Sequence, residues 1–220
     1  PPVHRHDILE VPRVIYFAVA CGACRIEIAH VQYYAWALLN RGALMPTRES
    51  FMTAAKQVEE AREKYKGIIV IDMVVPDYYA KYPKPCMGGW ARGILNVTPS
   101  GRVLPCHAAE SIKHLTFDTV KTRKLSDIWL NGDAFQKYRG TDWMKEPCRS
   151  CSRKEIDFGG CRCQAFALTG DAANTDPACS LSSLHAEWAK VAEVESHANP
   201  PEFIYRRVGG ANKTTPLVEA

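Results

Sequence analysis

Cysteine is concentrated in one short loop of this chain. Residues 148–163, CRSCSRKEIDFGGCRC, hold four cysteines and one isolated acid, Asp157, between the two pairs. Three further cysteines flank the loop at Cys86, Cys106 and Cys179. In a reducing compartment, clustered cysteines are metal ligands or redox groups more often than disulfides. The sequence therefore predicts a region that folds around metal rather than around a large apolar core.

The rest of the composition is that of an ordinary globular protein. Of the 220 residues, 46% are hydrophobic and 24% are charged, which is enough apolar material for one large or two small cores. We find neither a long apolar run nor a secretory signal pattern, and so expect a cytoplasmic protein that does not enter a membrane. The formal charge of +4 includes no block of lysine and arginine, which argues against nucleic-acid binding.

Residues 1–85 have the pattern of α/β units. Spacing predicts helices over 8–22 and 47–65 and a strand over 24–29, and the apolar run 67–75 is typical of a strand buried on both faces of a parallel sheet. This order predicts the C-terminal part of a (β/α) barrel. Because the chain starts with proline, we expect that an N-terminal part of the barrel precedes it.

A change of composition in the proline- and tyrosine-rich stretch 76–86 predicts a second, loop-rich domain over 86–196. The tail, 197–220, is expected to be loose. The predicted elements of the second domain are a β-hairpin at 94–106, a helix at 124–139 with Ser126 as its N-cap, and a helix at 180–196 with Ser180 as its N-cap.

The seven cysteines of the second domain do not divide into tetrahedral sites. One zinc ion would use four and leave three, whereas two centres of four ligands need eight. Asp157 can supply the eighth ligand if a carboxylate replaces a thiolate. A zinc-ribbon module, which also uses C-x2-C pairs, remains an alternative on spacing alone.

The whole spacing resembles the SPASM domain that is appended to radical S-adenosylmethionine (SAM) enzymes. The loop reads C-x2-C-x5-D-x3-C-x-C and is preceded by a G-x4-C hairpin and followed by a last cysteine. Asp157 stands where that family has cysteine, and Cys163 is an extra thiol. The resemblance implies an outer cluster on Cys148, Cys151, Asp157 and Cys179, and an inner cluster on Cys86, Cys106, Cys161 and Cys163.

The departures from the family pattern affect the nature of both clusters. Cys161 and Cys163 can reach one centre only from a sharply bent backbone, which Gly159 and Gly160 permit. The inner cluster is accordingly expected to be 2Fe-2S or 4Fe-4S, and the outer one 4Fe-4S. An aspartate is a harder ligand than thiolate and should change the outer cluster's potential. Cationic residues that would partly neutralise cluster charge are Arg149, Arg153, Lys154 and Arg162.

Longer phrases resemble the PqqA peptide cyclase family, among them HVQYYAWALLNR (30–41), DYYAKYPKPCMGGWARG (77–93) and LPCHAAESI (104–112). This resemblance implies a carbon–carbon cross-link between a glutamate and a tyrosine of the peptide PqqA, in pyrroloquinoline quinone biosynthesis. It also implies the peptide chaperone PqqD and an electron donor such as flavodoxin as partners. Another SPASM-type radical SAM peptide- or protein-modifying enzyme is the alternative.

The resemblance further implies SAM and a 4Fe-4S cluster that binds it. The C-x3-C-x2-C spacing of that cluster does not occur in these residues. We therefore expect the SAM site to lie in the absent N-terminal part, so that this chain alone would be catalytically incomplete.

Two groups of side chains follow predicted strands, at the mouth of the barrel where active sites gather. These possible catalytic residues are His4, His6, Asp7, Tyr33 and Tyr34, with Trp36 nearby. Loop packing or core is the alternative role for them. His107 follows a predicted ligand and could tune the inner cluster by hydrogen bonding. Cys21 and Cys24 form a further C-x2-C, which we interpret as ordinary buried thiols.

Overall fold

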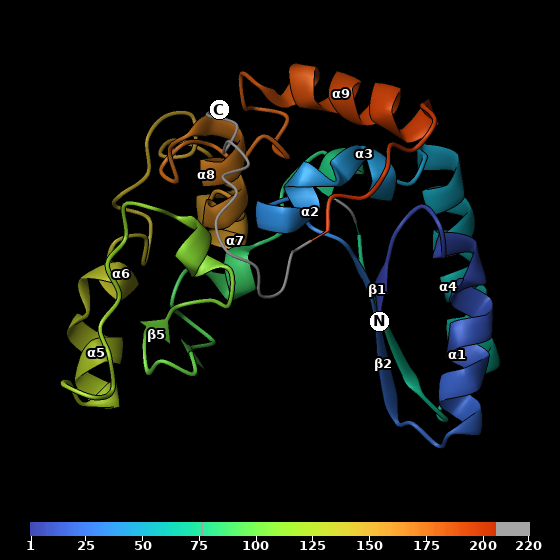
Figure 1. Cartoon of the computed structure of the whole chain (residues 1–220), viewed down its shortest axis with the longest axis horizontal. Coiled ribbons are helices and arrows are strands. Elements are labelled where there is room, and N and C mark those ends of the chain that lie inside the picture. The colour runs from blue at the N-terminus through green and yellow to red at the C-terminus, as the bar shows by residue number, and fades with distance from the viewer. Residues whose placement is uncertain (76, 206–220) are drawn as a thin grey trace.

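The computed structural model describes residues 1–75 and 77–205 (Figure 1). Strands β1 (Pro2–Val3), β2 (Arg25–His30) and β3 (Val70–Val74) form a parallel sheet in that order. Helices α1 (Val11–Ala20) and α4 (Arg48–Lys64) pack on one face of the sheet, as Figure 1 shows. The α/β expectation for this region is confirmed.

One-sided cover explains the burial pattern of the strands. In β2, Ile26 and Ile28 are buried against the helices, while Arg25 and Glu27, which alternate with them, are exposed. The prediction that the third strand is buried on both faces is wrong for the described residues, because Val70 is 51% exposed. The helices cover only the face on which Ile71 lies.

The long helix α4 begins where the sequence predicts. The Thr47 side chain accepts a hydrogen bond from the Ser50 backbone N–H at 3.1 Å, which satisfies one of the free donors of the first turn. Phe51, Ala54 and Val58 then form its buried stripe. The remaining elements of this region are η1 (Ile8–Glu10), α2 (Ala35–Leu39), α3 (Arg41–Leu44) and η2 (Asp77–Tyr79).

The second region consists of short elements joined by turns. The predicted hairpin is confirmed, since β4 and β5 pair antiparallel with Asn96 opposite Leu104. Its elements are η3 (Cys86–Gly88), β4 (Asn96–Val97), β5 (Val103–Leu104), η4 (Ala109–Ser111), α5 (Leu125–Asn131), α6 (Asp133–Gln136), α7 (Lys154–Asp157), α8 (Arg162–Thr169) and α9 (His185–His197).

Both predicted helix starts in this region are wrong. The helix at 124–139 divides into α5 and α6 because Gly132 is extended, and Lys124 rather than Ser126 is the residue before its first turn. Helix α9 starts at His185. Leu184 is its N-cap, and Ser180 belongs to the preceding loop, where its backbone N–H donates to the Lys81 carbonyl at 3.0 Å.

The second region also contains an apolar core, contrary to our expectation that it would fold mainly around metal. Val103, Leu104, Ile128 and Phe135 are buried in it. Trp90 is part of the same core and donates its indole N–H to the Ala134 carbonyl at 2.8 Å. Cys86, Cys106 and Cys163 belong to the same core, so three of the predicted ligands are packed into the scaffold that holds the hairpin and helices α5 and α6.

The chain returns to the first region at its C-terminal end. Helix α9 packs on α3 and η2, and Arg41 of α3 makes a bidentate ion pair with Glu195 at 2.6 Å. The expectation of a loose tail is wrong for residues 198–205, where Ile204 hydrogen bonds to Asn40. Residues 206–220 lie outside the described residues. None of the described helices is long and apolar enough to cross a membrane.

Candidate metal-binding sites

The four cysteines predicted for the inner cluster come together from three segments. Cys86 lies in η3, Cys106 follows β5, and Cys161 and Cys163 are at the start of α8. Hydrogen bonding with Cys161 raises the pKa of the Cys86 thiol, and hydrogen bonding with Cys106 raises the pKa of the Cys163 thiol. The four sulfur atoms, which we call the inner thiols, therefore form one interacting group.

A sharp bend before α8 makes this grouping possible. Gly159 and Gly160 have φ angles of +72° and +87°, in the region that favours glycine. The bend turns the chain from Asp157 to Cys161 within a few residues. The sequence-based prediction of a bend at this glycine pair is confirmed.

The second glycine of the pair is also closely packed. A Cβ atom at Gly160 would lie 2.6 Å from the Asp176 side chain and 2.7 Å from Pro83 Cβ. Gly170 offers a control, since its φ is +76° but nothing lies within 4 Å of a Cβ placed there.

Gly160→Ala is expected to destabilise the fold far more than Gly170→Ala. Backbone strain alone costs about 1 to 2 kcal/mol, whereas strain with a steric clash should cost about 4 kcal/mol or more. Thermal unfolding of both variants, with iron per chain as a second readout, measures the difference. Equal losses of stability would contradict the packing described for Gly160.

The predicted outer ligands line one small pocket. Cys148, Cys151, Asp157 and Cys179 all face it, together with Tyr82 and Leu181 among others. Burial raises the pKa of the Cys179 thiol, and the negative charges of Cys148, Asp157 and Cys151 raise it further. The four groups are therefore close enough to act on one another. We call this the outer pocket.

The acid in the loop points inward rather than into solvent. Asp157 is buried at 6% exposure and accepts hydrogen bonds from the Gly159 N–H and from Arg153 Nε, each at 3.1 Å. Arg153 in turn stacks on the ring of Tyr82, with its guanidinium carbon 4.2 Å from the ring centroid. These contacts fix the carboxylate at the pocket wall.

One arginine is fully buried between the two groups of cysteines. Arg162 is 1% exposed, and its guanidinium donates to the carbonyls of Ala172 and Asn174 at 2.7 and 2.8 Å and also to that of Gly159. Its Nε donates to the Gly160 carbonyl at 3.4 Å, and the guanidinium carbon lies 4.8 Å from the centroid of the Trp143 ring. Among the ion pairs of the described residues, none involves Arg162, so its charge has no carboxylate partner there. A negatively charged group nearby would complement it.

Asp176, which the sequence did not single out, joins the inner and outer groups. It is fully buried, and its Oδ2 accepts the N–H of Cys161 at 2.8 Å while its carbonyl accepts the N–H of Cys179 at 2.8 Å. Desolvation raises the pKa of Asp176 to about 7, and the negative charges of Asp77 and Cys161 add to the shift.

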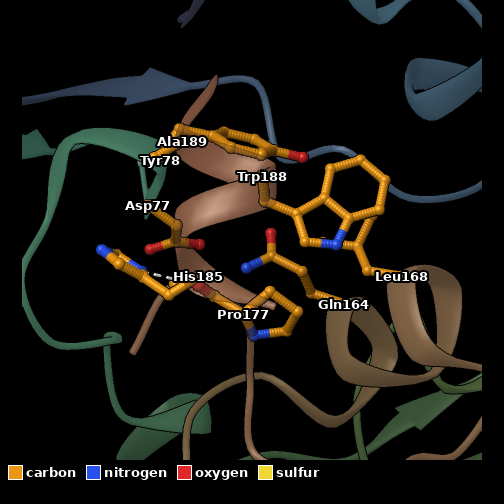
Figure 2. Close-up of a pocket in the computed structure, with 9 residues that line it drawn as sticks. Asp77, Tyr78, Gln164, Leu168, Pro177, His185, Trp188 and Ala189 are labelled. Carbon is orange, nitrogen blue, oxygen red and sulfur yellow. Dashed lines mark hydrogen bonds between the residues drawn. The ribbon is translucent and has the colours of Figure 1, made fainter. Parts of the chain in front are cut away.

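A polar junction lies where η2, α8 and α9 meet. Figure 2 shows the Asp77 carboxylate and the Gln164 amide directed toward one another at a small pocket. Gln164 also donates to Asp176 Oδ1 at 3.0 Å, and Lys84 pairs with Asp77 at 3.3 Å. The junction connects the barrel-like region to the cysteine loop. Isolated polar residues of this kind carry no motif by which the sequence could reveal them.

The residues predicted for the barrel mouth have different environments. His4 and Asp7 are linked, since the His4 N–H donates to Asp7 Oδ1 at 2.7 Å, and the His4 ring lies 5.5 Å from that of His6. Tyr33 is 2% exposed and packs on Tyr78 at 5.0 Å between ring centroids, so it is a core residue. The alternative of core packing holds for Tyr33.

Tyr34, by contrast, reaches the inner thiols. Its hydroxyl lies 3.2 Å from His107 Nε2, next to Cys106 in the chain. Burial and then the charges of Cys106 and Cys161 raise the pKa of Tyr34. Tyr34 and His107 thus link the carboxyl end of β2 to the inner thiols.

Cys21 and Cys24 are both exposed, so the prediction that they are buried thiols is wrong for the described residues. Cys21 ends α1, and the turn through Gly22 leads to β2 along the surface. This turn lies beyond the part of the sheet that α1 and α4 cover, so both thiols are exposed to solvent.

Within residues 1–75 and 77–205, no three histidine, cysteine, aspartate or glutamate side chains converge on the position of a single metal ion. Ligands of an iron–sulfur cluster bind different iron atoms and so need to surround a larger volume than the ligands of one ion. Two groups of four predicted ligands, several of them buried and with the Arg162 guanidinium nearby, have the chemistry of such clusters.

Comparison with known proteins agrees with this chemistry. Residues 86–152 match the SPASM family, described as an iron–sulfur cluster-binding domain. The chain is 60% identical over 217 residues to a PqqA peptide cyclase of Methylorubrum populi, with 99% of this chain and 56% of the relative covered. It is 61% identical over 210 residues to one of Methylobacterium sp. strain 4-46, with coverage of 95% and 55%. The chain thus spans a little over half the length of these curated relatives.

Solved structures show the same fold. Streptococcus suis SuiB matches with a TM-score of 0.55 at 14% identity, over 81% of this chain and 44% of that one. SuiB bound to S-adenosylmethionine matches with a TM-score of 0.54 at 15% identity, over 82% and 44%. The architecture is therefore α/β, with part of a (β/α) barrel followed by a loop-rich region in which residues 86–152 match the SPASM domain.

Proposed function

The chain is a sequence relative of the PqqA peptide cyclases, and from that premise we propose that the protein is a radical SAM peptide cyclase of pyrroloquinoline quinone biosynthesis. The observation that carries the proposal is the gathering of all eight predicted ligands into two groups, the inner thiols and the outer pocket. The sequence identity with the cyclases supports the peptide as the kind of substrate.

In this proposal the inner thiols bind one auxiliary cluster, 2Fe-2S or 4Fe-4S, and the outer pocket binds a 4Fe-4S cluster. Asp157 is the single oxygen ligand. When bound, such clusters supply one-electron acceptors that change geometry little on reduction. The reaction needs one, because the bond between a glutamate carbon and a tyrosine ring of PqqA removes two hydrogens. One of them leaves as a hydrogen atom, taken by the radical derived from SAM, and the other leaves as a proton and an electron.

The protein's own side chains would prepare both sites. The Cys106 sulfur accepts the Ala108 N–H, and the Cys151 sulfur accepts the Arg153 N–H, each at 3.4 Å. Hydrogen bonds of this kind favour the thiolate form that binds iron. The Arg162 guanidinium adds a fixed positive charge between the groups.

At the barrel mouth, His4, His6, Asp7 and Tyr34 are proposed to contact the peptide or SAM. They lie at or beyond the carboxyl ends of β1 and β2, where barrel enzymes place their active sites. The proposed cofactors also include SAM with its own 4Fe-4S cluster. The proposed partners are the chaperone PqqD and an electron donor such as flavodoxin.

Two measurements on the anaerobically reconstituted full-length enzyme test this function. Iron and sulfide content should correspond to the auxiliary clusters in addition to the SAM cluster, and zinc in their place would identify a zinc-stabilised module. Incubation with SAM, a reductant, PqqD and PqqA should then reduce the mass of PqqA by two hydrogens. Modification of other precursor peptides without this loss would instead indicate a different SPASM-type enzyme.

A further inference from the structure

The segment that follows α9 lies against α2 and α3. Trp36, Ala37, Asn40 and Leu44 form a groove on which residues 203–205 lie, and the two sides line an open space of about 300 Å³. Figure 1 shows the chain after α9 returning to α2 beside the sheet. Since α2 follows the carboxyl end of β2, the groove lies on the side of the sheet where the barrel mouth is.

The groove holds this segment through its main chain. Asn40 Nδ2 donates to the Ile204 carbonyl at 3.1 Å, and the Ile204 N–H donates to Asn40 Oδ1 at 2.7 Å. The indole N–H of Trp36 donates to the same carbonyl at 2.7 Å. Three hydrogen bonds thus converge on both polar backbone groups of a single residue.

Asn40 is fixed in place for this contact. It is 6% exposed, and its Nδ2 also donates to the Trp36 carbonyl at 3.0 Å, so its amide orientation is determined by bonds on both atoms. A buried amide that loses its partners is costly, and the groove therefore favours an occupant with a free N–H and C=O on one residue.

The side chains of the docked segment contribute little. Ile204 is 49% exposed and Tyr205 is 77% exposed, while the Phe203 ring lies 5.8 Å from that of His6. A site that binds the backbone of a segment and leaves its side chains exposed does not select for the sequence of that segment. Any extended peptide that reaches the barrel mouth could make the same three bonds.

We propose that the groove formed by Trp36 and Asn40 is a binding site for the main chain of the substrate peptide, and that residues 203–205 occupy it as an exchangeable placeholder. The inference rests on the proposed function, which makes the substrate a peptide. Binding of the peptide and docking of the tail then compete for Asn40, so that the apparent affinity falls with the fraction of docked tail.

Ile204→Pro tests the competition on the holoenzyme. Proline has no backbone N–H, so the bond to Asn40 Oδ1 is lost and the tail undocks, whereas Ile204→Ala keeps the N–H and serves as the matched control. Fluorescence anisotropy with labelled PqqA should show about fivefold tighter binding to Ile204→Pro and wild-type affinity for Ile204→Ala. Equal affinity of the two variants would overturn the competition.

Asn40→Asp tests the groove itself. A carboxylate cannot donate to a carbonyl, so in the Ile204→Pro background, where the tail does not compete, Asn40→Asp should weaken PqqA binding about tenfold at an unchanged circular dichroism spectrum. If wild-type enzyme converts PqqA but the folded double variant binds it as tightly as Ile204→Pro does, this inference fails and the proposed function stands. If wild-type enzyme binds PqqA but produces no two-hydrogen loss, the proposed function fails instead.

Discussion

Asp157→Ala is expected to remove the outer cluster while leaving the inner one intact. The carboxylate lies on the wall of the outer pocket and away from the inner thiols, and an alanine offers no ligand. Incomplete coordination exposes iron to loss, so the auxiliary iron should fall by about half if the inner cluster is 4Fe-4S and by about two thirds if it is 2Fe-2S. Iron analysis with electron paramagnetic resonance of the reduced protein measures this, since the inner cluster's signal should persist.

Glu155→Ala is the matched control for this prediction. Glu155 is an exposed acid on the same helical turn, α7, and should be removable without loss of iron. Asp157→Cys should retain a cluster at an altered potential, because a thiolate is a softer donor than a carboxylate. Unchanged signals from both clusters in Asp157→Ala would show that Asp157 is not a ligand.

Arg162→Met is expected to lower the free energy of unfolding by about 3 to 5 kcal/mol. The change leaves the carbonyls of Gly159, Ala172 and Asn174 without their buried donor, at about 1 to 3 kcal/mol for each unpaired group. For a chain of this size the melting temperature should fall by about 10 °C. Arg162→Lys should not restore it, because an ammonium group cannot reproduce the planar set of donors.

The same substitution should shift the cluster potentials. Loss of a fixed positive charge between the two sites makes reduction less favourable, so both midpoint potentials should become more negative in a spectroelectrochemical titration. Arg149→Met is the control, since Arg149 belongs to the same loop but is exposed. Similar melting temperatures and potentials for the two variants would contradict the charge role given to Arg162.

The sequence was most informative where spacing imposes geometry. The resemblance to the SPASM domain implied one site for the C-x2-C pair, Asp157 and the last cysteine, and the structure brings these residues to one pocket. The glycine pair likewise predicted the bend, because few other residues adopt positive φ angles. The ligand assignment itself stays a prediction.

Local sequence patterns were less reliable where tertiary contacts determine the conformation of the backbone. Ser180 has the chemistry of an N-cap but uses its backbone N–H on Lys81, and Gly132 interrupts a stretch that has helical spacing. Asp176 and Asn40 could not be found at all from the sequence, because each acts on backbone groups far away in the chain. Such contacts become visible only when the segments are placed in space.

Asp176 has a consequence for how the two sites are filled. Its carboxylate accepts the backbone N–H of Cys161, and its carbonyl accepts the backbone N–H of Cys179. Fixing the position of either cysteine therefore restricts the position of the other. Insertion of the first cluster would therefore pre-arrange the neighbouring ligands and lower the entropy cost of the second. Metallation of this protein should accordingly be cooperative, with half-loaded molecules scarcer than independent filling would give.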